Sequence, residues 1–136
     1  MLAAFPTNVT PFFKNSKNIV VVWCGTNDSG VVPASTTWNN LVSYANAAHA
    51  RGAKVIVVTM MSAINRDTFK NQLNPLIRNN WSGVFDALAD VAADANLGAD
   101  GAFNNHTYFS DGTHPTDSCS QTVIAPIIQT QIDSFT

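Results

Sequence analysis

Two short polar segments lie far apart in the sequence and carry side chains that could cooperate in proton transfer. They are Gly25-Thr26-Asn27-Asp28 and Asp111-Gly112-Thr113-His114-Pro115. A histidine is a general base near neutral pH, and a carboxylate three residues before it can hold its imidazole through the Nδ1 proton. The amide of Asn27 can donate N–H groups to an oxygen that gains negative charge. Apart from a nucleophile, these are the groups needed for attack on a carbonyl carbon.

An apolar run, residues 19–24, comes directly before the first of these segments and is rich in β-branched side chains. A run of this kind that stops at Gly and Asn indicates a strand buried on both faces of a parallel sheet. Ligands bind at the carboxyl ends of the strands in such sheets. We therefore expect Asn27 to face a ligand site, with Gly25 and Asp28 shaping and orienting the turn.

Strand-like and amphipathic segments alternate along the rest of the chain, which is the pattern of a doubly wound α/β fold with a parallel sheet and helices in two outer layers. Further strands are predicted over residues 54–60 and 85–91. Helices are predicted over residues 37–51, with Thr36 or Ser35 as the N-cap and Gly52 at the end, over residues 67–80, where Pro75 can kink or interrupt the helix, and over residues 118–135. We interpret residues 1–136 as a single domain.

Residues 96–113 form a long segment rich in Gly, Asn and Asp that leads to His114. Three aromatic residues are interleaved with it, Phe103, Tyr108 and Phe109. Long loops inside a compact domain are usually functional or mobile. Two interpretations stay open: the aromatic side chains line a substrate pocket, or they only anchor the loop to the core.

The two cysteines flank the predicted site in sequence, because Cys24 precedes the first polar segment and Cys119 follows the second. If both segments meet, the two sulfur atoms could form a disulfide. The alternative is that each cysteine packs in the core as a small apolar residue. A cysteine nucleophile is less favoured, because His114 is the one nearby cation in the sequence that could stabilise a thiolate.

Gly25-x-Asn27-Asp28 and Asp111-x-x-His114-Pro115 together resemble two sequence blocks of the SGNH (GDSL-type) hydrolases. This superfamily contains esterases, lipases and carbohydrate deacetylases with a flavodoxin-like fold. The resemblance implies a flavodoxin-like three-layer fold, with His114 as the base, Asp111 as its partner and Asn27 in the oxyanion hole. It implies no metal or other cofactor, and a small ester or an acetylated carbohydrate as the substrate.

Two other blocks of that family do not occur in this sequence. They are a Gly-Asp-Ser block near the amino terminus, which carries the serine nucleophile, and a glycine block that supplies a second oxyanion donor. The 24 residues before Gly25 contain no glycine. We therefore expect the amino-terminal strand and helix of the family's fold to be missing, and the chain to be inactive alone. Loss of a central strand predicts exposed apolar strand edges and self-association.

Three hypotheses about function follow. The first is a truncated serine esterase. The second is a non-catalytic module that binds a carbohydrate or acyl ligand. The third is a complete esterase that uses a separate segment or an unconventional nucleophile, for which the sequence offers Ser29, Ser62, Ser110 and Ser134. A purely structural interpretation stays open as well. In it, Asn27 and Asp28 only form a turn, while His114 begins the last helix with Asp111 and Thr113 as capping groups.

Composition narrows the function classes. Hydrophobic residues make up 46% of the 136 residues, yet no apolar run approaches the roughly 20 residues that span a bilayer. The net charge is −2 and the basic residues are scattered, so neither a nucleic-acid partner nor a membrane is expected. A largely uncharged polar surface suggests a secreted parent protein, although residues 1–6 lack the features of a signal peptide. Four Asn-x-Ser/Thr sequons fit the same location, at Asn8, Asn27, Asn80 and Asn105.

Overall fold

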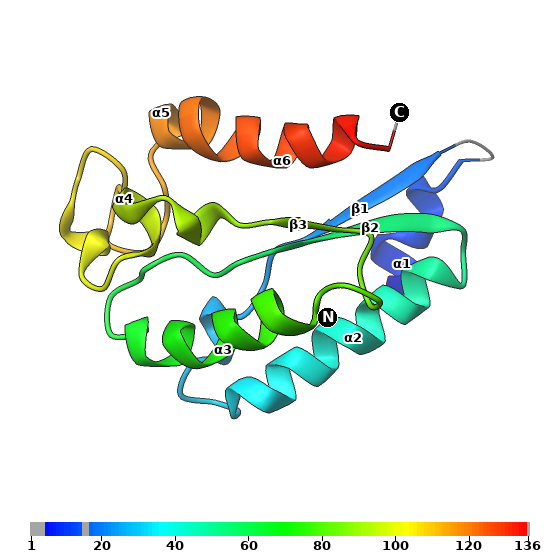
Figure 1. The fold of residues 1–136 in the computed structure, drawn as a ribbon, viewed down its shortest axis with the longest axis horizontal. Helices are drawn as coiled ribbons and strands as arrows, with labels where there is room; N and C mark the ends of the chain where they lie inside the picture. Colours follow the sequence, from blue (N-terminus) through cyan, green and yellow to red (C-terminus); the bar gives the residue numbers. More distant parts are fainter. Residues whose placement is uncertain (1–4, 15–16, 136) are drawn as a thin grey trace.

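A three-stranded parallel sheet forms the centre of the protein, and helices cover both of its faces. The computed structural model describes residues 5–14 and 17–135, so part of the opening segment discussed above, residues 1–4, lies outside the described residues. The strands are β1 (Asn18–Val22), β2 (Ala53–Val58) and β3 (Ala87–Ala89), in the sheet order β1-β2-β3 (Figure 1). The predicted small α/β fold with a parallel sheet, of the flavodoxin-like kind, is confirmed.

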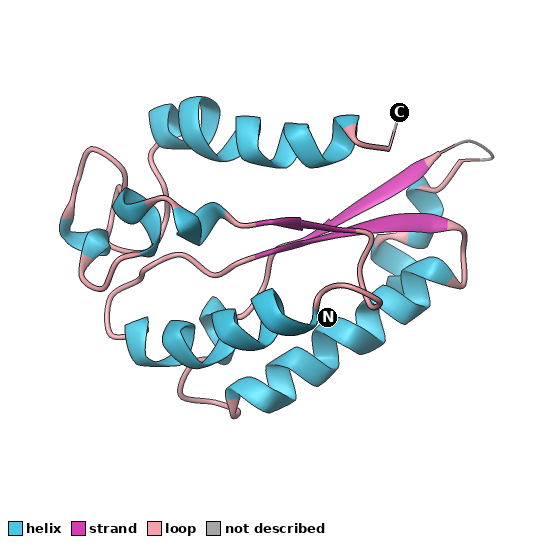
Figure 2. Cartoon of the chain, in the orientation of Figure 1, coloured by secondary structure: helices cyan, strands magenta, loops and turns pink. Residues whose placement is uncertain are grey.

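The two helical layers are unequal. Helices α2 (Ala34–His49) and α3 (Asp67–Asn80) lie against one face of the sheet, and the carboxy-terminal helical segment lies against the other (Figure 2). That segment consists of α5 (Asp117–Cys119), a π-helical turn η6 (Ser120–Ile124) and α6 (Ala125–Asp133). The remaining elements are short: α1 (Phe5–Asn8), η2 (Thr10–Phe12), η3 (Thr26–Asp28), η4 (Val91–Ala93), α4 (Ala95–Gly98) and η5 (Ala102–Asn104).

The core has two parts because successive side chains of a strand point to opposite faces of a sheet. Val55 and Val57 of β2 pack with α2 and α3, whereas Ile56 and Val58 pack with the carboxy-terminal helical segment and the buried Phe109. All four of these β2 residues are at most 1% exposed. β2 is therefore the central strand and is buried as predicted, although it spans residues 53–58 rather than 54–60.

β1 departs from the prediction. It ends at Val22 rather than at Cys24, and it is not buried on both faces, since Val21 is 39% exposed and Trp23, just after the strand, is 37% exposed. Within the described residues β1 pairs with β2 alone, so it is an edge strand. Val21 is exposed because the carboxy-terminal helix α6 packs mainly over β3, at the opposite edge of the sheet.

The predicted helices form, with a correction at each end of α2. α3 has the predicted bounds, and Pro75 does not interrupt it. α2 begins earlier than predicted, after Pro33, so Ser35 and Thr36 lie inside its first turn and neither is the N-cap. α2 also ends two residues earlier than predicted, at His49, and residues 50–52 form the turn after it, in which Gly52 has a positive φ of 75° that glycine tolerates best.

The last predicted strand and helix also differ in detail. β3 has three residues instead of seven, because η4 begins at Val91 and Phe85 precedes the strand. The carboxy-terminal helical segment begins after Thr116, whose hydroxyl oxygen accepts the backbone N–H of Cys119 at 3.1 Å. Its π-helical turn ends two residues before Pro126, which lacks the N–H that a regular α-helix would use there.

Candidate active site

A cleft of about 840 Å³ opens at the carboxyl ends of β1 and β2. Three segments line it: residues 23–28 after β1, residues 61–63 after β2 and residues 113–115 in the loop before the last helices, together with Asn40 of α2. The fold thus brings Gly25, Asn27, Asp28 and His114 to one cleft, although more than eighty residues separate the two polar segments. Asp111 does not line the cleft but contacts His114.

The Asp111 carboxylate organises the turn that presents His114. Its Oδ1 accepts the backbone N–H groups of Thr113 and His114 at 2.9 and 2.8 Å, and its Oδ2 lies 2.7 Å from Nδ1 of His114. The backbone bond from His114, the imidazole and the backbone bond from Thr113, in that order, lower the pKa of Asp111 to about 2. Asp111 is therefore ionised near neutral pH and favours the imidazole tautomer with the proton on Nδ1, which leaves Nε2 as a proton acceptor.

Backbone contacts on both sides hold this turn in place. Phe109 and Pro115 form an antiparallel bridge, and Ser110 N donates to His114 O at 2.8 Å. Gly112 has a φ of 77°, and its carbonyl accepts Ile64 N–H at 2.8 Å. The interpretation of His114 as the start of the last helix, with Asp111 as a capping group, is therefore wrong. The imidazole is 74% exposed and accessible to a ligand.

The turn that carries Asn27 is held from both of its sides. Asp28 Oδ2 accepts the Thr37 hydroxyl at 2.7 Å, and Arg66 Nη1 donates to the Thr26 and Ser29 carbonyls at 2.7 and 3.2 Å. Asn27 itself is exposed, and no hydrogen bond joins its side chain to another described residue. Its amide N–H groups are thus available to a ligand in the cleft.

Gly25 has a close neighbour that explains why no larger residue fits there. Its φ is 128°, and a Cβ added to it would lie 2.6 Å from Cδ2 of Leu73, a fully buried residue of α3. The glycine therefore lets the backbone turn sharply at the end of β1 while it lies directly against α3.

None of the four candidate serines offers an exposed hydroxyl in the cleft. Ser62 lines the cleft, but it is fully buried and its Oγ accepts the Phe103 N–H at 3.3 Å. The hydroxyls of Ser110 and Ser134 donate to backbone carbonyls, those of His114 and Gln131. Ser29 is not among the lining residues. Of these four serines, none is thus both exposed in the cleft and unengaged.

The cysteines are not bridged. Cys24 packs with the core on the side of α2 and α3, whereas Cys119 is buried on the side of the carboxy-terminal helix, so the sheet separates them. Burial raises the pKa of both thiols, and the nearby carboxylates of Asp28 and Asp94 raise them further. Neither thiol has the lowered pKa of a cysteine nucleophile.

The loop over residues 96–113 contains more structure than predicted. α4 and η5 lie within it, and Phe109 is fully buried. Phe103, Tyr108 and Phe109 are absent from the lining of the cleft, which favours the interpretation of these aromatic residues as anchors.

Sequence reasoning missed two residues of the cleft and one buried charged residue of α3. Trp23 and Asn40 line the cleft, and Lys70 is buried in α3. The position of Trp23 at the carboxyl end of the first predicted strand could have identified it as a lining residue. The helical pattern gives no comparable signal for Asn40 or for Lys70.

The described residues contain no group of three or more His, Cys, Asp or Glu side chains that could hold a metal ion. Within the same part of the chain, no helix combines the length and apolar character that crossing a membrane requires. A scan of the sequence against models of known protein families finds no match, and neither does a search among curated proteins.

Proposed function

We propose that this chain carries the general-base and oxyanion part of an SGNH-type serine ester hydrolase site, and that its cleft holds the ester. The observation that carries the proposal is the 2.7 Å contact between Asp111 Oδ2 and His114 Nδ1 beside the cleft that Asn27 also lines. In this arrangement His114 Nε2 takes a proton from the attacking hydroxyl, and Asp111 stabilises the imidazolium that forms. Asn27 donates to the oxygen of the tetrahedral intermediate.

The nucleophile is not assigned to a residue of the cleft, because Ser62 is buried and engaged by Phe103. We therefore propose that the chain alone is inactive as a serine esterase, in that it forms no serine acyl-enzyme, and that His114 only activates water weakly. The proposed substrate is a small ester or an acetylated carbohydrate, and the proposed location is extracellular. Both rest on the resemblance to SGNH hydrolases, and the second also on the sparsely charged surface.

The test is the hydrolysis of p-nitrophenyl acetate by the purified chain and by three variants. We expect a rate above background that His114→Ala abolishes and that Asn27→Ala lowers by up to the ~10²-fold typical of a lost oxyanion donor. His106→Ala is the matched control, since His106 is an exposed histidine of the same loop that does not line the cleft. If His106→Ala and His114→Ala lower the rate equally, the activity is unspecific imidazole catalysis and the proposal is wrong.

A fluorophosphonate probe with peptide mass mapping identifies any serine nucleophile. Absence of an adduct in a folded chain with His114-dependent hydrolysis supports the proposal. An adduct on Ser62 that is lost in His114→Ala would instead support a complete esterase with an unconventional nucleophile.

A non-catalytic binding module is the second candidate, and the composition of the cleft favours it. Trp23, Asn27 and Asn40 give the cleft an aromatic face and neutral amides, which are groups that bind sugars. The discriminating measurement is a titration with an acetylated sugar followed by amide chemical shifts in NMR. Shifts at Asn27, Asn40 and Thr113 without turnover of any ester would favour the binding module over the hydrolase.

A further inference from the structure

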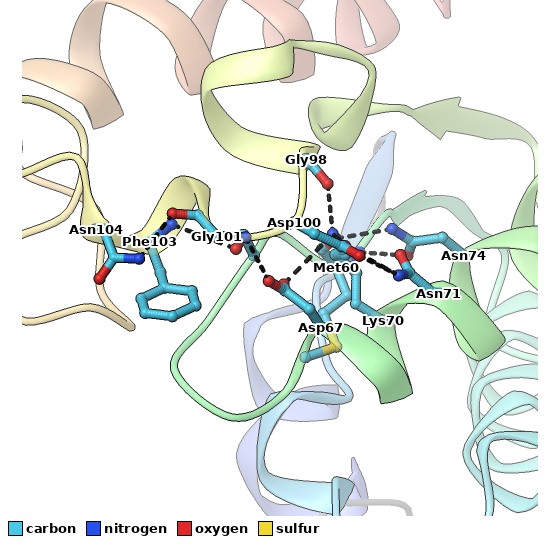
Figure 3. Close-up of polar contacts among 11 residues, drawn as sticks. Met60, Asp67, Lys70, Asn71, Asn74, Gly98, Asp100, Gly101, Phe103 and Asn104 are labelled. Carbon is cyan, nitrogen blue, oxygen red and sulfur yellow. Dashed lines mark hydrogen bonds and ion pairs between the residues drawn. The ribbon is translucent and has the colours of Figure 1, made fainter.

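A buried lysine connects helix α3 to the loop that carries the Asp111–His114 turn. Lys70 lies on the second turn of α3, and its side chain is 2% exposed. Its ammonium donates to the Gly98 carbonyl and to Asp100 Oδ1, the latter at 2.8 Å, and lies 3.4 Å from Asp67 Oδ1 (Figure 3). An ammonium group has three N–H donors and is costly to bury unless acceptors surround it. Two of these three oxygens belong to the loop, so the ammonium joins residues 98–100 to α3.

Two neighbouring side chains of α3 also form hydrogen bonds with the same loop. Asp67 Oδ2 accepts the Gly101 N–H at 2.7 Å, and Asn71 Nδ2 lies 2.9 Å from both carboxylate oxygens of Asp100. Asp67 Oδ1 is buried and has no hydrogen-bond partner among the described residues, so its compensation is the nearby charge of Lys70. Loss of Lys70 would leave that oxygen uncompensated and release the loop.

The helix itself is fixed to the sheet next to this cluster. Asn74 binds both backbone groups of Met60, just after β2, with its Oδ1 accepting the N–H and its Nδ2 donating to the carbonyl, each at 2.8 Å. Asn74 lies one helical turn after Lys70, so its bonds to Met60 also fix the position of the ammonium relative to the central strand.

The contacts continue from the lysine cluster to the catalytic turn. Phe103, two residues after Gly101, donates its backbone N–H to Ser62 Oγ at 3.3 Å. Gly112 lies against the Phe103 ring and Ile64, since a Cβ added to it would be 3.7 Å from each, and its carbonyl accepts the Ile64 N–H. Asp111 and His114 flank Gly112 in sequence. A shift of residues 98–103 would therefore change the direction in which the turn points.

We propose that Lys70 is a positioning residue for His114: its buried ammonium fixes residues 98–101, and this anchor aims the Asp111–His114 turn at the cleft. The inference rests on the proposed role of His114 as a base. Its test measures the position and hydrogen bonding of the turn rather than ester hydrolysis, so the two can fail separately.

The experiment compares amide hydrogen exchange and histidine ring 15N signals in the full chain and three variants. Lys70→Met removes the ammonium, and Asp100→Ala removes a partner that is 65% exposed and whose loss the fold tolerates more easily. Arg78→Met is the matched control, because Arg78 lies on the same helix and pairs with Asp90 at 2.8 Å rather than with residues 98–101.

We expect exchange of the Ile64 amide to accelerate about tenfold in Lys70→Met and Asp100→Ala, relative to the β2 amide of Val57, as when a charge-assisted bond is lost. The ring 15N signals of His114 should shift in both variants, because the ring moves relative to the cleft while its bond to Asp111 is kept, and they should stay unchanged in Arg78→Met. Unchanged His114 signals and an unchanged Ile64 to Val57 ratio in Asp100→Ala would overturn the proposal, even if Lys70→Met fails to fold. The same changes in Arg78→Met would also overturn it.

Discussion

Replacement of Gly25 by alanine tests the geometry of the Asn27 turn most directly. The new Cβ would lie 2.6 Å from Leu73 Cδ2, well inside van der Waals contact, and the φ of 128° disfavours any L-residue with a side chain. Backbone strain at such a position costs about 1–3 kcal/mol, and overpacking of a dense core costs about 1–3 kcal/mol more. We therefore expect Gly25→Ala to lower the free energy of unfolding by about 2–6 kcal/mol.

The control is Gly30→Ala in the same loop. Gly30 has a φ of 78°, but nothing lies within 4 Å of an added Cβ, so this variant carries only the cost of the left-handed conformation, about 1–2 kcal/mol. Urea unfolding measures both changes, provided that the slope of free energy against urea concentration stays constant. If Gly25→Ala loses no more stability than Gly30→Ala, the contact with Leu73 is not as described.

A double-mutant cycle separates the clash from the backbone strain. Leu73→Ala removes Cδ2 and alone costs about 2–5 kcal/mol, because it leaves a cavity in a fully buried position. In the double variant the new methyl group enters that space. We expect the double loss to be smaller than the sum of the single losses by about 1 kcal/mol or more. Strict additivity would assign the whole effect of Gly25→Ala to its φ.

Three further predictions concern the same site. The pKa of Asp111 is about 2 against an ordinary 3.8, so its bonds stabilise the turn above about pH 4, and this stabilisation is lost as the pH falls toward 2. The measurement is a 13C titration of its carboxyl carbon, and a midpoint at or above 3.8 would contradict the prediction. Thr37→Val removes the hydroxyl bond to the Asp28 carboxylate and should cost about 1.5–3 kcal/mol in urea unfolding, whereas no loss would mean that another group replaces it. Mass spectrometry after alkylation of the unfolded, unreduced chain should find two modified cysteines, Cys24 and Cys119, and an unmodified pair would show a disulfide.

The sequence predicts the elements whose signals are local. α3 matches its predicted bounds because Phe69, Leu73 and Ile77 repeat at helical spacing and are all buried. The buried strand β2 is also predicted from its β-branched run, although the prediction extends it two residues too far, to residue 60. The Asp111–His114 contact is local as well, because both residues belong to one turn.

The features that sequence reasoning missed depend on distant partners. An apolar run cannot tell an edge strand from a central one, so the exposure of Val21 follows only from the sheet order. The sequence left open whether the two cysteines form a disulfide, because tertiary packing sets the face of the sheet that each sulfur occupies. Lys70 looks like an ordinary surface lysine in sequence, since its partners Gly98 and Asp100 lie about thirty residues away.

The compactness of the Asp111 turn has a consequence for how such a site can change over evolutionary time. One carboxylate binds two backbone N–H groups and the imidazole within four consecutive residues, so the pair forms wherever this short sequence is kept. Its aim, in contrast, is inherited from Ile64 and the loop contacts that surround Gly112. Substitutions in the surrounding loop can therefore change the direction of the imidazole relative to the cleft while its contact with Asp111 is kept, so the two properties can change separately.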